Sequence, residues 1–134
     1  MKLTGVHSIQ IADETFVAAD PATVGRVLAD RASWRRWFSD LILDVVEDRA
    51  EKGVRWSVAG PLTGTMEVWL EPVLDGVVLH YFLHAEPTGA SAWELARMKT
   101  AAMNHRRRVA GKRMAFEVKA RAEQGRPVGV APGR

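Results

Sequence analysis

The sequence contains no cysteine, a single tyrosine, and no apolar run of the length a membrane-spanning helix needs. The absence of cysteine excludes a disulfide scaffold, a thiolate metal site and a cysteine nucleophile. A transmembrane helix needs about 18 or more consecutive apolar residues, so we expect none. Residues 1–12 lack the apolar segment of a signal peptide, and we expect a cytoplasmic protein. With 47% hydrophobic residues in a chain of 134, a single buried core is expected, and global disorder is excluded.

Tryptophan, by contrast, is abundant for so short a chain. The five tryptophans are Trp34, Trp37, Trp56, Trp69 and Trp93. Each buries about 150–250 Å² when it lies inside a protein. A core of ordinary density needs few such side chains, whereas a cavity wall or an interface uses more of them.

The charge is unevenly distributed along the chain. Residues 1–90 carry 13 acidic and 8 basic side chains, and residues 91–124 carry 9 basic and 3 acidic ones. The basic run His105–Arg108 spans a full helical turn, so its members cannot all face one partner. Nucleic-acid binding needs a one-sided patch, and we expect none here. We interpret the run as a solvated helix face that neutralises the acidic segment. The alternatives are that the run binds an anionic ligand head group, nucleic acid or a membrane surface.

The first third of the chain predicts one strand and two short helices. Apolar residues alternate imperfectly over residues 7–18, which indicates a strand with a bulge near Asp13 and Glu14. Asp20 followed by Pro21 predicts a helix start, because Asp caps free amides and Pro fits the first helical position. That helix should run to about residue 29. A second helix is expected from Ser33.

Four further strands are expected, over residues 41–47, 53–59, 62–71 and 76–85. Asp75-Gly76 indicates a hairpin between the last two. The final strand is apolar on both faces, so both faces should be covered.

The rear of the chain predicts one long helix. Ser91 and Glu94 have the spacing of a capping box, and no proline follows before Pro127. We therefore expect a helix of about 34 residues, over 91–124. Gly111 is its weak point, where it allows a bend or close backbone approach. The expected apolar seam consists of Leu95, Met98, Ala102, Val109 and Phe116. Glycine and proline over 125–134 predict a flexible tail after a domain spanning 1–124.

This order of elements resembles the helix-grip fold of the START-like superfamily, also called SRPBCC. More narrowly, the chain is similar to small actinobacterial proteins of the polyketide cyclase/dehydrase and lipid-transport type. The likeness rests on residues 14–24, Trp34, Trp37, 64–71 and 77–83. The family usually has seven strands and five can be placed here, so the chain resembles a shortened variant.

The resemblance implies an α+β fold in which a curved antiparallel sheet of about five strands, with two short helices, packs against the long C-terminal helix. It also implies a pocket between sheet and helix that binds a lipid, a polyketide or a similar apolar molecule, without a cofactor. The expected lining residues are Trp37, Phe38, Trp56, Met66, Met98 and Ala102.

Two alternatives to simple binding stay open. The first is a cyclase/dehydratase-type enzyme in which His80, Tyr81 or Arg55 acts as acid, base or oxyanion anchor. Against it, His80 and Arg55 fit the outer face of the sheet, where Arg55 could pair with Glu67. His80 and His84 would lie about 13 Å apart in a strand, too far to share a metal, so no metal site is expected.

The second alternative is a non-catalytic homodimeric interaction module. A last strand that is apolar on both faces suggests a surface that needs a partner, most simply another copy. Trp69 and Trp93 are the tryptophans best placed for such an interface, because Trp69 lies on the face of Thr65 and Glu67 and Trp93 begins a helix.

Overall fold

The computed structural model describes residues 8–124 of the chain. In chain order, the elements are β1 (Ile9–Val17), α1 (Pro21–Leu28), α2 (Arg31–Trp37), β2 (Ile42–Asp48), the 3₁₀ turn η1 (Ala50–Lys52), β3 (Gly53–Ala59), β4 (Leu62–Val73), β5 (Gly76–Pro87), α3 (Ala92–Arg97) and α4 (Thr100–Ala122). The expected tail over 125–134 lies outside the described residues, so the division into domain and tail stays a prediction. Within residues 8–124, no helix is long and apolar enough to cross a membrane.

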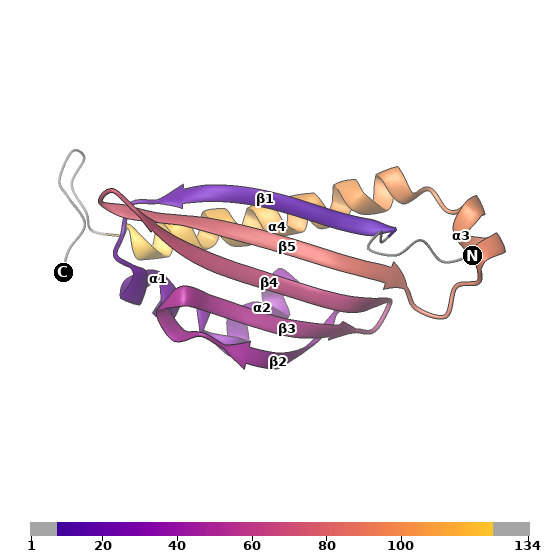
Figure 1. Cartoon of the computed structure of the whole chain (residues 1–134), viewed down its shortest axis with the longest axis horizontal. Coiled ribbons are helices and arrows are strands. Elements are labelled where there is room, and N and C mark those ends of the chain that lie inside the picture. The colour runs from indigo at the N-terminus through magenta and orange to yellow at the C-terminus, as the bar shows by residue number, and fades with distance from the viewer. Residues whose placement is uncertain (1–7, 125–134) are drawn as a thin grey trace.

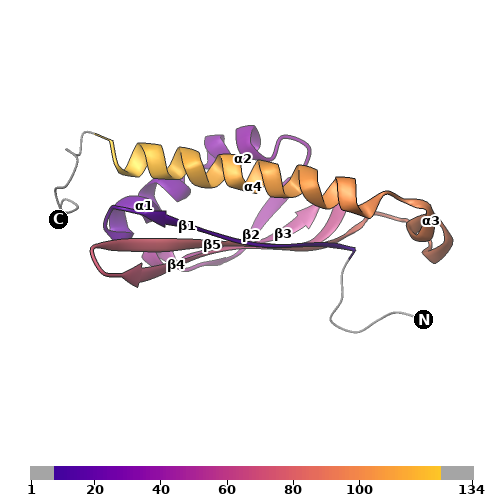
Figure 2. The same cartoon turned by 90° about the horizontal axis from the view of Figure 1, so that it is seen from above.

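One antiparallel sheet carries all five strands, in the order β1-β5-β4-β3-β2. Helices cover one of its faces: α4 runs along the β1 side, and α1 and α2 lie behind β3 and β2 (Figures 1 and 2). The predicted α+β helix-grip architecture with five strands is therefore confirmed.

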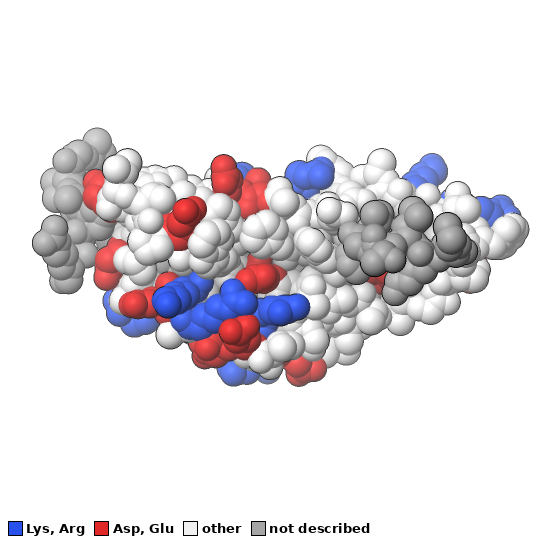
Figure 3. Space-filling model, viewed as in Figure 1, with Lys and Arg blue, Asp and Glu red and all other residues white. Residues whose placement is uncertain are grey.

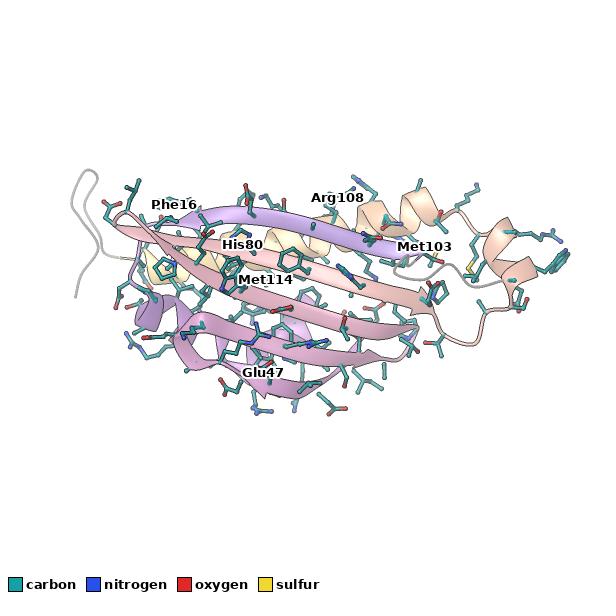
Figure 4. The ribbon with its side chains drawn as sticks, viewed as in Figure 1. Phe16, Glu47, His80, Met103, Arg108 and Met114 are labelled. Atoms are coloured by element: carbon teal, nitrogen blue, oxygen red, sulfur yellow. The ribbon has the colours of Figure 1, made fainter. Side chains whose placement is uncertain are left out.

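Strand alternation determines which side chains enter the core. The inward residues of β3 and β4 are buried: Val54, Trp56, Val58, Met66, Val68 and Leu70. On β5 the set beginning at Val77 is buried, whereas the set beginning at Val78 is half-buried on the face that the helices leave uncovered (Figure 2). The expectation that both faces of this strand are covered is therefore wrong. The largest fully buried side chains are Trp56, Tyr81, Ile9, Ile11, Leu28, Leu62, Met66, Leu70, Leu79, Leu83 and Met114. The core thus lies between the inner face of the sheet and the helices. Figure 4 labels Met114 on α4 and His80 on the opposite, outward side of β5.

The bulge expected in β1 is wrong. The strand pairs with β5 residue for residue, from Ile9 with Ala85 to Val17 with Val77. Its alternation looked out of phase because polar residues occupy inward positions. Asp13 and Thr15 are held there by Lys112 of α4, whose ammonium lies 3.0 Å from each.

The first helix begins as expected, with Pro21 as its first residue, but the expected cap is not made. The Asp20 side chain accepts no hydrogen bond from the first turn. Instead, the backbone carbonyl of Asp20 accepts the first helical bond, from the amide of Val24 at 3.1 Å.

The expectation of a single long helix is also wrong. The Ser91–Glu94 capping box is present, with both bonds at 3.1 Å, yet the helix that it starts ends at Arg97. Met98 is extended (φ −77°, ψ 146°), and α4 begins at Thr100. No side chain of α3 is buried, because α3 lies beyond the end of the sheet (Figure 1). Without tertiary contacts, helical propensity alone does not keep the two segments continuous.

The apolar seam expected on the long helix is not its buried face, which is a correction to the prediction. The buried residues of α4 are Gly111, Met114, Ala115 and Val118, whereas Phe116 is exposed. The same face of α4 continues toward the start of the helix with Arg107, one turn before Gly111, and Asn104, two turns before it. The side-chain amide of Asn104 donates to the carbonyl of Ser8, just before β1, and accepts from the amide of Gln10 in β1, both at 2.9 Å. A search for apolar residues alone therefore selects the wrong face.

Candidate functional site

A groove of about 560 Å³ lies between α1, the start of α2, and the end of β2 with the turn η1. Its apolar lining comes from Leu28 of α1, Trp34 of α2, Val45 of β2 and Val54 of β3. Small-molecule sites in proteins are mostly apolar concavities of about 300–1,000 Å³. The groove therefore has the size and lining of a small-molecule site.

Trp34 forms the fixed wall of this groove. Its indole nitrogen donates a hydrogen bond to the carbonyl of Leu28 at 2.7 Å, and its ring meets Trp56 edge-on at 5.2 Å. These two contacts hold the ring between α1 and β3.

Another residue of the groove lining, Gly25, lets α1 approach η1, because a Cβ there would press against the backbone of Ala50.

A second groove of about 360 Å³ continues along the inner side of β2. It shares Arg31 and Trp34 with the first groove and adds Leu41, Ile42 and Leu43. Because β2 is an edge strand, its inward side chains Leu43 and Val45 are only half-buried. Together the two grooves form an apolar trough between the edge of the sheet and α2.

The residues expected to line a pocket lie in several places. Phe38, Trp56 and Met66 are buried on the inner side of the sheet, and Trp37 is half-buried beside them. The remaining two lie elsewhere: Met98 belongs to the link between α3 and α4, and Ala102 is exposed on α4. The two grooves are lined by other residues.

Three buried polar atoms near this core have no hydrogen-bond partner among residues 8–124. They are the indole nitrogens of Trp37 and Trp56 and the hydroxyl of Tyr81. Tyr81 stacks on Phe38, with ring centroids 6.1 Å apart, and burial raises the pKa of its phenol. The phenol therefore stays protonated at neutral pH and cannot act there as a general base.

The three catalytic candidates do not meet. Tyr81 points into the core, whereas His80 and Arg55 lie on the outward face of the sheet. His80 bonds Glu71 at 2.9 Å and stacks on Trp69 at 4.7 Å. Arg55 is exposed, and its register partner Glu67 is held by Arg49 at 2.5 Å. Within the described part of the chain, no group of three or more potential metal ligands occurs.

Sequence reasoning missed Leu28, Val45 and Val54 as lining residues because their apolar character fits any core position. The sequence shows that Trp34 belongs to an aromatic cluster, but its contact with the Leu28 carbonyl has no signature there. Arg31, which lies over the Trp34 ring at 5.1 Å, could not be separated from other surface arginines.

No family model and no curated protein matches the sequence. Solved structures share the fold at low identity. The solution structure of the Aha1 dimer from Colwellia psychrerythraea matches with a TM-score of 0.58 and 15% identity, over 89% of this chain and 99% of that one. The crystal structure of TTHA0849 from Thermus thermophilus matches with a TM-score of 0.55 and 15% identity, over 88% of this chain and 99% of that one.

A Polyketide_cyc-like protein from Corynebacterium glutamicum matches with a TM-score of 0.50 and 17% identity, over 86% of this chain and 89% of that one. At such identities the similarity concerns the fold alone. The chain therefore shares its fold with Aha1-like and SRPBCC-like helix-grip proteins.

Proposed function

We propose that this protein binds a hydrophobic small molecule, of the lipid or polyketide-like kind, in the trough between the β2 edge of the sheet and helices α1 and α2. The groove of about 560 Å³ beside Trp34 carries this proposal. Removing apolar surface from water contributes about 25 cal/mol per Å², so a ligand covering this lining gains affinity from burial alone.

The trough lies in the same layer as the pocket expected from the sequence, but nearer the edge strand. Beneath α4, the space over the sheet is occupied by Met114, Ala115 and Val118, and Gly111 contacts the ring of Tyr81. Catalysis has no comparable support, because His80 and Arg55 lie on the other face of the sheet. A cytoplasmic location stays a prediction from the sequence.

A displacement assay with a neutral apolar fluorophore, N-phenyl-1-naphthylamine, tests the proposal. Ala29 lines the groove at the end of α1, and Ala32 is an exposed alanine of α2 outside the lining. We expect Ala29→Trp to weaken probe binding by about tenfold, because the indole occupies part of the groove. Ala32→Trp is the matched control and should bind like the unmodified protein.

Equal binding by both variants, or no probe binding by the unmodified protein, would contradict the proposed site. Circular dichroism of each variant checks that the fold is retained.

A second candidate function is self-association through the uncovered face of the sheet. Trp69 and Phe16 are 39% and 41% exposed there, and His80 stacks between Trp69 and Phe82. On this face the largest cluster of charged side chains lies over β2 and β3, and separate acidic side chains lie over β1 and the adjoining end of β4 and β5 (Figure 3). The Aha1 structure with the same fold is described as a dimer.

Light scattering after size exclusion at micromolar concentration tests this candidate. We expect a dimer that Trp69→Lys dissociates, because a charge placed in a desolvated interface is costly. Trp93→Lys is the control, since Trp93 is 67% exposed on α3, away from the sheet face. A mass of one subunit for the unmodified protein would contradict self-association.

A further inference from the structure

Cationic side chains frame the mouth of the groove beside Trp34. Its lining includes four basic residues, Arg26, Arg31, Arg49 and Lys52. It includes two acidic residues, Asp48 and Glu51. An apolar groove with an excess of positive charge at its rim matches a ligand that has an apolar body and a negative end.

Two of these four cations are already engaged. Arg49 bonds Glu47 at 2.9 Å and Glu67 at 2.5 Å, and Arg26 donates to the hydroxyl of Thr23 at 3.1 Å. Unlike these two, Arg31 and Lys52 make neither an ion pair nor a side-chain hydrogen bond with any residue of the described range 8–124, and both side chains are exposed. Arg31 and Lys52 are thus the cations available to a ligand.

The two acidic residues of the rim offset only part of its positive charge. The Asp48 carboxylate accepts a hydrogen bond from the backbone amide of Ala50 at 2.8 Å, which directs it toward its own turn. Glu51 is exposed in the middle of η1. Of the lining cations, Arg49 alone is paired with acidic residues in the described part of the chain, so the rim keeps a positive excess over Asp48 and Glu51.

The position of Arg31 links the charge to the apolar wall. Its guanidinium lies 5.1 Å from the centre of the Trp34 ring, which is itself part of both grooves. An anionic group that bonds this guanidinium is therefore held beside the apolar wall to which Trp34 belongs. The same ligand can then meet the charge and the apolar lining together.

Resting on the proposed function, we propose that the ligand is an amphiphile with an anionic head group, bound at the groove mouth by Arg31 and Lys52, with its apolar tail against Leu28, Trp34 and Val54. A guanidinium can donate two parallel hydrogen bonds to a carboxylate, and charge-assisted bonds of this kind are stronger than neutral ones. The head group therefore decides which apolar molecules bind.

Three probes with the same twelve-carbon tail test the proposal: dodecanoate, dodecanol and dodecyltrimethylammonium. Each is used below its micelle concentration, and displacement of N-phenyl-1-naphthylamine measures its affinity. We expect dodecanoate to bind at least about tenfold more tightly than dodecanol, and the cationic probe to bind least. Added salt should weaken dodecanoate binding and leave dodecanol binding unchanged, because salt screens exposed charges.

Charge-removing variants then locate the head group. The double variant Arg31→Gln with Lys52→Gln should bind dodecanoate no better than dodecanol, with dodecanol affinity retained. Arg108→Gln is the matched control, because Arg108 is an exposed arginine of α4, away from α1 (Figure 4). It should keep the preference for dodecanoate.

The outcomes that would overturn the proposal are distinguishable from one another. If dodecanoate and dodecanol bind equally well, the anionic head group is wrong and the proposed function stands. If neither displaces the fluorophore, both proposals fail. A dodecanoate preference that persists in the double variant also overturns the assignment to Arg31 and Lys52.

Discussion

At the scale of single residues, Gly111 decides how closely α4 lies on the sheet. A Cβ at this position would stand inside van der Waals contact with three carbons of the Tyr81 ring. The ring is also packed on another side, because it stacks on Phe38 and its hydroxyl is buried. The absence of a side chain at Gly111 is thus a packing requirement.

We expect Gly111→Ala to lower the free energy of unfolding by about 1–3 kcal/mol, the usual cost of overpacking a core. A loss of stability would be informative, because helix propensity alone favours alanine over glycine in a helix interior by about 1 kcal/mol and so predicts a gain. Urea denaturation measures the change.

The control is the same substitution in a Tyr81→Leu background, where the ring is absent. There Gly111→Ala should be neutral or stabilising. A stabilising effect in the unmodified protein would show that the close approach is not required.

Residue-level predictions from the sequence succeeded where burial follows from apolar character. Trp34, Trp37 and Trp56 were expected in the core and at the end of the pocket; Trp34 and Trp56 are buried, and Trp37 is half-buried. Trp69 and Trp93, the tryptophans expected at an interface, are exposed. The inward positions of Thr15 and Asn104 could not be predicted. Their hydrogen-bond partners lie more than 90 residues away along the chain.

At the scale of elements, α4 is joined to the rest of the protein by charge as well as by packing. Arg107 bonds both carboxylate oxygens of Asp40, in the link between α2 and β2, at 2.9 and 2.6 Å. These hydrogen bonds hold the pKa of Asp40 below its ordinary value and raise the pKa of Arg107. Lys112 with Asp13 and Arg121 with Asp30 repeat the arrangement.

The lowered pKa of Asp40 gives a defined pH dependence. The pair stabilises the fold above the ordinary aspartate pKa of about 4, and its contribution is lost as the pH falls through the lower folded-state value. Asp40 is half exposed, so the effect is small. Between about pH 5 and pH 2, we therefore expect Asp40→Asn to lose less stability than the unmodified protein, as measured by urea denaturation.

The double variant Asp40→Asn with Arg107→Gln should show the same dependence of unfolding free energy on pH as Asp40→Asn alone. If the unmodified protein and Asp40→Asn lose stability in parallel as the pH falls, the pair does not contribute.

Elements with a local signature were predictable, and those that depend on distant contacts were not. Alternation predicted β3 with its observed bounds, Gly53–Ala59. Each expected strand or helix start lies within two residues of an observed one, and α4 is the helix whose separate start was not expected. The break at Met98 was missed, because residues 91–99 contain neither proline nor glycine. The break lies where the chain passes beyond the end of the sheet (Figure 1). The residues around Met98 carry no local signal for the position of that end.

At the scale of the whole molecule, the basic and acidic parts of the chain pair with each other. The acidic front segment forms the sheet, α1 and α2, and the basic rear segment forms α4, which pairs with it through Arg107, Lys112 and Arg121. Within the basic run, Arg107 pairs with Asp40 of the acidic segment, but it does so from the inward side of α4 and not from a solvated face. The cations left for a ligand are instead Arg31 and Lys52, on the acidic half of the chain.

The order of strands in the sheet also bears on how the protein is made. Strands β2 to β5 follow one another as neighbours, so they can pair through short hairpins as they leave the ribosome. The first strand has no partner until the last has been synthesised, since Ser8 bonds Glu86 across 78 residues. Until β5 is made, β1 and the edge of β4 are both open to pairing with other chains. Insertion of β5 between them therefore both completes the sheet and removes two aggregation sites from the nascent protein.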